Sequence, residues 1–309
     1  MNLHSPHSTI FRNAVSSGSK STATAIAVRL CMTLSVIAAM AGLAPGAAAE
    51  EVAKAFTVSR RANVHVHTND GSVRVSASDS NQVEFRVEYQ GFVLNKDLRV
   101  DSRQDGDKVE LTARVTGNWG MHWGRNSKQL HIEVRMPKDS DLDLETGDGS
   151  VDAAGISGTA TIHTGDGSIK AQNLRGTVRL RTGDGSIEAY GLDGKVEATS
   201  GDGHIRLEGR FDALDIKTGD GSVDAHANTG SRMNGSWNIR TGDGSVDLVI
   251  PGDLQANIEA STGDGHISMG MPVTIEGTFS TSQLHGKLNG GGQPLTIHTG
   301  DGSIRLSKG

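Results

Sequence analysis

From residue 53 onward, apolar and polar side chains alternate along most of the chain. In the segment Val178–Thr182, for example, Val178, Leu180 and Thr182 fall on one face, while the arginines between them fall on the other. An alternation with a period of two residues is typical of a β-strand with one buried face, because successive side chains of a strand point to opposite sides. No stretch in this part shows a convincing helical period. The pattern therefore predicts an all-β chain.

A short motif, Thr-Gly-Asp-Gly-Ser followed by Ile or Val, recurs eight times between Thr146 and Ile304 with little change. Its first five aspartates are each 18 residues apart, and the later intervals are 23, 21 and 37 residues. A looser copy surrounds Asp70. A short fixed period of this kind indicates a repeat architecture. The eight central aspartates are Asp148, Asp166, Asp184, Asp202, Asp220, Asp243, Asp264 and Asp301.

Each repeat reads as two short strands joined by two turns. If the repeats stack in chain order, equivalent apolar residues form columns with a column of hydroxyl side chains between them. One repeat cannot bury its apolar side alone, but stacked repeats bury a continuous core. We therefore predict a single-stack, β-helix-like β-solenoid of ~18-residue coils over residues 142–309. One expected inward column is Leu144, Ile162, Leu180, Ala198, Ile216, Ile239, Ala260 and Ile297.

Residues 50–141 contain strand patterns but only the loose motif at Asp70, followed by an insert of about 60 residues before the repeat register resumes at Leu142. The end of a solenoid is an open sheet edge unless something covers it. We therefore expect residues 50–141 to form an N-terminal β-strand cap that includes the first repeat.

The first 49 residues have the pattern of a secretory signal peptide. Arg12, Lys20 and Arg29 precede an apolar run, and small residues follow up to Ala49. We expect export to the periplasm, the cell surface or the medium. The apolar run is short for a membrane span, so no span is expected in the mature chain. The single cysteine, Cys31, lies in this segment, and the mature chain would have no disulfide.

Composition limits which residue types can build the core and which classes of partner are expected. Aromatic residues make up only 4% of the chain, so Val, Ile, Leu, Ala and Thr must build the core. Without the first 49 residues the chain has 27 basic and 36 acidic residues, a net charge of −9. Nucleic acid is therefore not an expected partner.

The Asp-Gly pair of the motif has two interpretations. In the structural one, the pair supplies a residue with positive φ and a side chain that caps its own turn. In the functional one, carboxylates about 4.8 Å apart repel by about 1 kcal/mol in water and attract Ca²⁺, which prefers oxygen ligands. Known calcium-binding β-rolls use a longer nonapeptide that this chain lacks. The candidate calcium ligands are Asp148, Asp166, Asp184, Asp202 and Asp220.

The segment Asn118–Arg125 holds two of the three tryptophans between glycines. It could pack over the end of the stack, or it could present an aromatic platform to a sugar or a protein, since Trp and Arg often anchor binding. The candidate binding residues are Trp119, Trp123 and Arg125. Trp237 occupies an inward position and is expected in the core.

Catalytic signals are weak. The chain lacks Gly-x-Ser-x-Gly, His-Glu-x-x-His and a phosphate-binding loop. Paired carboxylates recur in every repeat, so no single acid is marked as different from its neighbours. His204 and His266 are some three repeats apart, which predicts no zinc cluster. We expect a protein that is not an enzyme. A polysaccharide-active β-helix enzyme and a calcium-stabilised repeat module are the alternatives.

The repeats, the lead-in Val134–Pro137 and the glycine-rich stretch Gly286–Gly292 before Ile304–Leu306 carry a family resemblance. The chain resembles the bacterial "putative adhesin" family, a domain of unknown function, over nearly all of its mature length. It departs from that family in the uniformity of its Gly-Asp-Gly-Ser turns. The resemblance implies an adhesive or scaffolding surface of the cell envelope that contacts an envelope protein or polysaccharide. It assigns no catalytic residue.

Overall fold

The computed structural model describes residues 49–116 and 128–309, and the secondary structure there is entirely β, as predicted. The N-terminal strands are β1 (Glu50–Thr57), β2 (Ala62–Thr68), β3 (Ser72–Ser78), β4 (Gln82–Gln90), β5 (Leu98–Asp105), β6 (Lys108–Val115) and β7 (Gln129–Pro137). The strands that follow are β8 (Ser140–Thr146), β9 (Val151–Ala154), β10 (Ser157–Thr164), β11 (Ile169–Gln172), β12 (Arg175–Thr182), β13 (Ile187–Thr199), β14 (Ile205–Lys217), β15 (Val223–Ala227), β16 (Trp237–Thr241), β17 (Val246–Ile250), β18 (Ala256–Thr262) and β19 (Ile267–Gly270). The last strands are β20 (Thr274–Phe279), β21 (Gln283–Leu288), β22 (Gln293–Thr299) and β23 (Ile304–Lys308).

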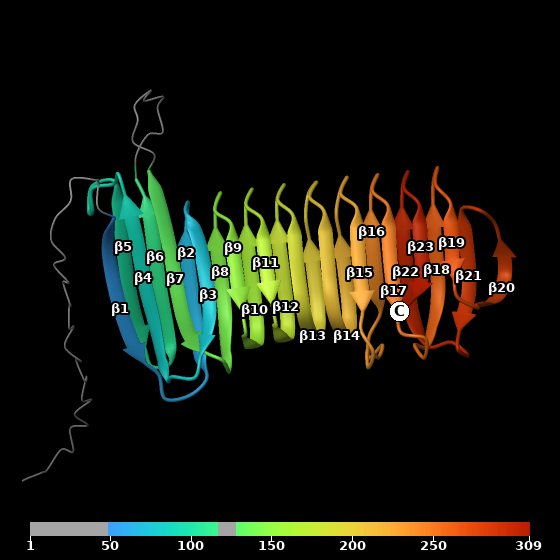
Figure 1. The fold of residues 1–309 in the computed structure, drawn as a ribbon, viewed down its shortest axis with the longest axis horizontal. Coiled ribbons are helices and arrows are strands. Elements are labelled where there is room, and N and C mark those ends of the chain that lie inside the picture. Colours follow the sequence, from blue (N-terminus) through green and yellow to red (C-terminus); the bar gives the residue numbers. More distant parts are fainter. Residues whose placement is uncertain (1–48, 117–127) are drawn as a thin grey trace, which may run out of the picture. The chain divides into compact units, whose positions relative to one another are not determined.

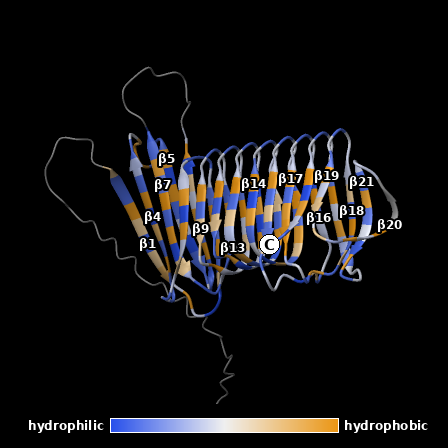
Figure 2. Cartoon of the chain, turned by 45° about the vertical axis from the view of Figure 1, so that its right-hand side comes forward, coloured by the Kyte–Doolittle hydropathy of each residue, from blue (hydrophilic) through white to orange (hydrophobic). Residues whose placement is uncertain are grey.

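Burial follows the period of two along these strands. In β12, Val178, Leu180 and Thr182 are buried, whereas Arg179 and Arg181 between them are exposed. Figure 2 shows the same alternation as orange and blue bands across neighbouring strands. The buried side chains form one cluster that extends from Val58 to Leu306. The cluster is mostly aliphatic, as the low aromatic content predicts.

Strands of successive repeats pair in parallel and in register. Thr164 pairs with Thr182, and Ile169 with Ile187, each one 18-residue repeat further along. The pairings arrange the strands in two rows, and β13 and β14 take part in both through their two halves. The motif turn, here called the corner, leads from the first row to the second. The 18-residue period is therefore the number of residues in one full turn of the chain, which contributes one strand to each row before the next turn begins.

At the C-terminal end the spatial order differs from the chain order. The prediction placed Ala260 beside Ile239 in the inward column, but Ile297 lies between them, paired with both. In the second row β23 likewise pairs with β17 on one side and β19 on the other. Figure 1 shows the red β22 and β23 between β16 and β17 and the orange β18 and β19. The last repeat of the sequence is thus inserted between the Asp243 and Asp264 repeats, which corrects the expected order.

The N-terminal end shows the same kind of insertion. Strands β2 and β3, which flank Asp70, pair with β8 and β9 on one side and with β6 and β7 on the other. The insert therefore supplies a further parallel layer outside the first repeat. Beyond it, β4 and β1 in one row and β5 in the other pair antiparallel.

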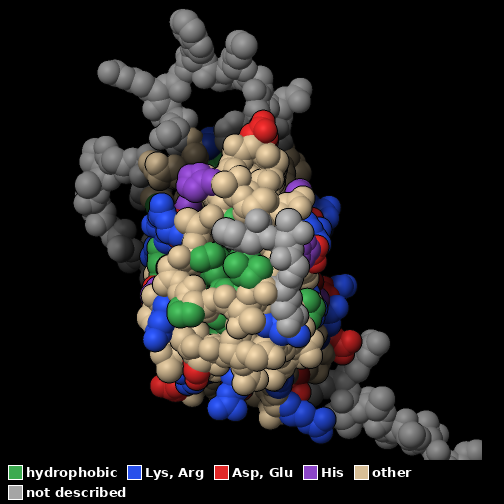
Figure 3. Space-filling model, turned by 90° about the vertical axis from the view of Figure 1, so that its right-hand side faces the viewer, with side chains coloured by type: hydrophobic (Ala, Val, Ile, Leu, Met, Phe, Trp, Pro, Cys, Tyr) green, Lys and Arg blue, Asp and Glu red, His purple; other side chains and the backbone are tan. Residues whose placement is uncertain are grey.

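Antiparallel strands also follow the last parallel layer at the C-terminal end, where β21 pairs with β18, and β20 with β21. Figure 3 views this end and shows hydrophobic side chains among uncharged atoms, with charged groups around them. Met269, Met271 and Val273 are partly buried against the core there, and Ile275 is exposed.

The second glycine of each motif is required by close approach of the backbone. A Cβ placed on Gly185 would lie 2.1 Å from the carbonyl oxygen of Gly167 in the preceding repeat, and the other clean repeats have similar values. Real Cβ atoms do not come that close to a backbone oxygen. The expectation that these glycines supply positive φ is wrong, because among motif glycines only Gly71 has it. Gly71 is also the one whose amide is capped by the preceding aspartate, Asp70.

The hydroxyl column closes the corner with hydrogen bonds in two directions. The Thr182 hydroxyl donates to the Gly167 carbonyl of the preceding repeat at 2.8 Å and accepts from the Gly185 amide at 3.2 Å. Ser200 makes the same two bonds in the next repeat. An unpaired buried polar group costs about 1–3 kcal/mol, so this pairing stabilises the corner. Thr146 of the first repeat is an exception, because its hydroxyl has no partner among the described residues. The column is therefore structural, and Thr and Ser both serve.

Within residues 49–116 and 128–309, the structure contains no helix long and apolar enough to cross a membrane.

We predict that Gly185→Ala destabilises the chain strongly. The new Cβ would force the Asp166 and Asp184 repeats apart at the corner, and we expect a loss of roughly 2–4 kcal/mol in the free energy of unfolding. The matched control is Gly270→Ala, whose Cβ would come no closer to a neighbouring atom than 3.4 Å, the distance to Ser307 Cβ. Denaturant unfolding followed by circular dichroism compares the two variants. Equal unfolding midpoints would contradict the close-approach explanation.

Candidate binding surface

The motif aspartates form an exposed row along the corners. Apart from Asp264 in the last repeat of the stack, each carboxylate lies close to the next repeat. Asp166 Oδ1 would lie 3.5 Å from a Cβ placed on Gly183, and Asp184 Oδ1 would lie 3.4 Å from one placed on Gly201. Among the described contacts, none of these carboxylates accepts a hydrogen bond or joins an ion pair. The eight exposed aspartates are, in spatial order, Asp148, Asp166, Asp184, Asp202, Asp220, Asp243, Asp301 and Asp264.

The structure brings the five predicted calcium ligands into this row but does not gather them around a point. In the part of the chain that the structure describes, no three His, Cys, Asp or Glu side chains converge as metal ligands. A cation would therefore bridge carboxylates of neighbouring repeats, with water supplying further oxygens. The calcium ladder stays a prediction.

The outer face of the second strand row carries charges of alternating sign. At one register position, Arg74, Asp152, Lys170, Glu188 and Arg206 follow one another along β3, β9, β11, β13 and β14. Further along, Asp224 and Asp247 lie opposite each other on β15 and β17 and interrupt the alternation, and Arg305 donates to Asp247 on the next strand at 3.0 Å. Exposed pairs of this kind each contribute roughly 0–1 kcal/mol, and a register shift of two residues would place Lys170 opposite Ser186 or Tyr190 and lose its pairing with Glu188. The ladder therefore favours one pairing register.

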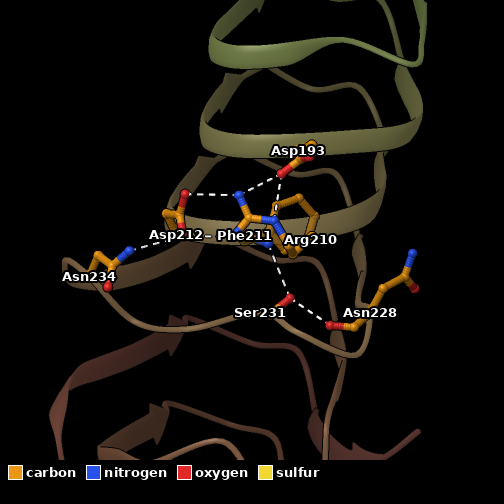
Figure 4. Close-up of polar contacts among 7 residues, drawn as sticks. All are labelled: Asp193, Arg210, Phe211, Asp212, Asn228, Ser231 and Asn234. Atoms are coloured by element: carbon orange, nitrogen blue, oxygen red, sulfur yellow. Dashed lines mark hydrogen bonds and ion pairs between the residues drawn. The ribbon is translucent and has the colours of Figure 1, made fainter.

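A cluster of polar side chains around Arg210 contacts the long loop between β15 and β16, residues 228–236 (Figure 4). Arg210 donates from Nε to Asp193 Oδ1 of the preceding repeat at 2.5 Å, and from Nη1 and Nη2 to Asp212 at 2.7 and 3.0 Å. Asn234, in the loop, donates to Asp212 Oδ1 at 3.0 Å. The guanidinium therefore joins two repeats and, through Asp212, the loop.

Backbone contacts complete this attachment. The Phe211 amide donates to Ser231 Oγ at 3.1 Å, and the Ser231 hydroxyl donates to the Asn228 carbonyl at 2.7 Å. Beneath them, the Phe211 ring packs edge-on against Trp237 at 6.1 Å between centroids. Trp237 is fully buried, as its inward position predicts.

The charges of the cluster shift its pKa values. Hydrogen bonds from Arg210 hold the pKa of Asp212 below its usual range, against partial burial, which acts in the opposite direction. The hydrogen bonds to Asp212 in turn raise the pKa of Arg210. Both shifts come from a structural ion pair, and such pairs also perturb pKa values outside catalytic sites.

The predicted aromatic platform, Trp119, Trp123 and Arg125, lies outside the described residues. The strands that flank it are described, and they show where the segment is attached. Strand β6 pairs in parallel with β2, and β7 pairs in parallel with β3. The C-terminal end of β6 and the N-terminal end of β7 therefore lie at the end of the rows where the corner between β2 and β3 also lies. The predicted signal peptide also lies outside the described residues.

Sequence reasoning missed two features of this surface. The Arg210 cluster combines side chains from positions 193, 210, 212 and 234, and only the five-residue expansion of one interval marked the region. The alternating ladder could have been found by writing the repeats in register, because each strand supplies one charge to it.

The chain belongs to the Toastrack DUF4097 family, whose model matches residues 62–307, and the resemblance inferred from the motifs is confirmed. Similar solved structures include one named as a putative lipid binding protein from Parabacteroides distasonis, with 16% identity over 83% of this chain and 96% of that chain and a TM-score of 0.45. A putative adhesin from Bacteroides fragilis has 13% identity over 83% and 97% of the two chains, with a TM-score of 0.42. A putative cell adhesion protein from Clostridium sporogenes has 13% identity over 85% and 100%, with a TM-score of 0.30. No curated protein matches significantly.

We predict that Arg210→Gln loosens loop 228–236 without unfolding the stack. The charged hydrogen bonds to Asp193 and Asp212 are lost, and because these groups are about one-third exposed the cost should be roughly 1 kcal/mol. Hydrogen exchange of the loop amides measures it. The control is Arg206→Gln, whose partner Asp224 anchors no loop.

The same variant has a pH signature. A carboxyl group whose folded pKa is depressed contributes stability above its unfolded pKa of about 4, and this stability is lost as the pH falls through the lower folded value. The difference in loop exchange between the native chain and Arg210→Gln should therefore be full near neutral pH and shrink below about pH 4. A difference that persists unchanged in acid would contradict the ion-pair account.

Proposed function

We propose that the chain is an exported, non-enzymatic β-solenoid of the cell envelope that acts as an adhesive or scaffolding surface. The observation that carries the proposal is the in-register repetition of the outer surface. Equivalent outward residues from successive repeats lie one strand spacing apart, as in the pairs His163–Arg181 and Lys170–Glu188. Neighbouring strands are about 4.8 Å apart, so an outward group recurs at a fixed interval, and at the motif corners that group is always an aspartate.

Such a surface suits a partner that is itself repetitive or extended. Each contact is weak when exposed, but many contacts at a fixed spacing add up when the partner has a matching period. The strand ladders also hold the surface rigid, so binding costs little ordering of the protein. An envelope polysaccharide or an extended envelope protein is the kind of partner that fits.

The unpaired aspartate row supports a role for calcium within this function. Carboxylates with no protein partner remain available to a hard cation, and extracellular calcium modules often bind in the millimolar range. We propose that calcium either stiffens the row or bridges it to an acidic partner.

The test measures retention of purified envelope polysaccharide and envelope protein fractions on the immobilised full chain. We expect saturable retention that weakens when Asp166, Asp184 and Asp202 are replaced by Asn. The matched control replaces Lys170, Glu188 and Arg206 by Gln, which changes the second strand row and leaves the corners intact. Binding and thermal melts are compared in millimolar Ca²⁺ and in chelator, and cell fractionation locates the chain.

Three outcomes would count against the proposal. No retention above an inert protein would remove the binding function. Release of reducing ends from a glycan panel would favour the polysaccharide-active alternative. Melting curves that coincide with and without Ca²⁺, together with unchanged binding, would remove the calcium ladder.

A further inference from the structure

Two histidines lie side by side on the outer face of β2. His65 and His67 are separated by one residue, so their side chains leave the strand on the same side, about 6.6 Å apart at a rise of about 3.3 Å per residue. They form the only His-x-His sequence in the chain. Together they line a hollow whose other walls come from β6 and β8, including Glu110, Asp143 and Glu145.

A carboxylate from β8 faces each ring. His65 pairs in register with Asp143, and His67 with Glu145. The distance from His65 Nδ1 to Asp143 Oδ2 is 3.1 Å, and that from His67 Nδ1 to Glu145 Oε2 is 3.4 Å. An ionised carboxylate only accepts hydrogen bonds, so the His65–Asp143 contact requires the proton of the neutral ring on Nδ1. Glu145 favours the same tautomer of His67 through its negative charge. Nε2 then carries a free lone pair on both histidines.

The rings are accessible at these free atoms. The side chains of His65 and His67 are 34% and 41% exposed. Among the described contacts neither Nε2 has a protein partner. On the β6 side, Glu110 is already engaged by Arg103 and Lys108. It therefore does not compete for the imidazoles.

This arrangement matches what metal-binding histidines require. Such a histidine usually donates its other ring N–H to a carboxylate or carbonyl, which fixes the tautomer and raises the basicity of the ligating nitrogen. The surface alternative is a pair of cross-strand contacts contributing roughly 0.2–1 kcal/mol each. That alternative explains each pair alone but gives no reason for two histidines oriented alike. Other outward histidines, such as His131 and His298, stand singly and contact serine hydroxyls.

We propose that His65 and His67 bind one late first-row divalent metal ion, Cu²⁺ in preference to Zn²⁺, through their Nε2 atoms. Asp143 and Glu145 orient the rings from behind. The described residues offer no group of three converging ligands, so solvent or a partner completes the coordination. Imidazole suits both ions, and the usual order of stability places Cu²⁺ above Zn²⁺. Two nitrogens about 2.0–2.1 Å from one ion require the rings to tilt toward each other.

The test uses the full chain without a histidine tag. Calorimetric titration with Cu²⁺ and with Zn²⁺ gives stoichiometry and affinity, and electron paramagnetic resonance of the Cu²⁺ form reports the coordinated nitrogens. We expect the double variant His65→Gln, His67→Gln to lose one equivalent of bound Cu²⁺ and its nitrogen signature. The variant Asp143→Asn should keep the stoichiometry and weaken binding about 10–100-fold.

The control is the double variant His131→Gln, His298→Gln, which removes two outward histidines that contact serine hydroxyls. It should leave the number of bound Cu²⁺ equivalents unchanged. Histidines outside the described residues, His4, His7 and His122, are present in every variant, so the difference between variants isolates the proposed site. Unfolding midpoints confirm that each variant is folded. Absence of binding to the native chain would overturn the proposal, and so would a double variant that binds the same equivalents with the same affinity. Neither result bears on the binding surface proposed above.

Discussion

The structure depends on how closely two backbones can approach at the corner. The second motif glycine brings its repeat so near the preceding one that no side chain fits, and the hydroxyl beside it ties the two together. This contact is made between neighbouring repeats, so it sets their spacing and register at the same time. The strands on either side of the corner then pair without offset, and apolar residues meet apolar residues along the core. The aspartate contributes its backbone amide to these contacts in several repeats, as at Asp166 and Asp243, but its carboxylate has no hydrogen-bond partner among the described contacts.

The equivalence of the corners also explains the order of the repeats. Gly300 and Gly302 approach the Asp243 corner as closely as any repeat approaches its neighbour in the chain, and Gly263 and Gly265 approach the Asp301 corner in the same way. Corners that are not consecutive in the chain therefore meet with the same geometry as consecutive ones. The loops that connect the repeats decide their order in space. At each end of the stack, one repeat is inserted between two repeats that are consecutive in the sequence. As a result the C-terminal strand β23 is paired on both sides and leaves no free edge.

The residues predict much of this architecture and little of its order. The period of two predicted the strands, and the recurring Thr and Gly positions predicted the columns, because both are local patterns. The reason for the glycines was wrong, since close approach between repeats is not visible in one turn. The positions of Ile297 and Ala260 were reversed because identical motifs carry no information about which one is adjacent. The pairing of His65 and His67 with β8 needed the register across the 60-residue insert, and Trp119 and Trp123 remain predictions.

The central claim is that corners are interchangeable neighbours and that the Asp301 corner lies between those of Asp243 and Asp264. Disulfide cross-linking in a Cys31→Ser chain tests it most directly, because a disulfide joins Cα atoms only about 4.4–6.8 Å apart. Ser303 lies beside both Ser245 and His266, with a 3.2 Å contact from its amide to the Ser245 hydroxyl and a 2.9 Å contact from its hydroxyl to His266 Nδ1. The account predicts rapid cross-linking of the pair Ser245→Cys, Ser303→Cys and none of the pair Ser245→Cys, His266→Cys. The opposite result would mean that the repeats stack in chain order.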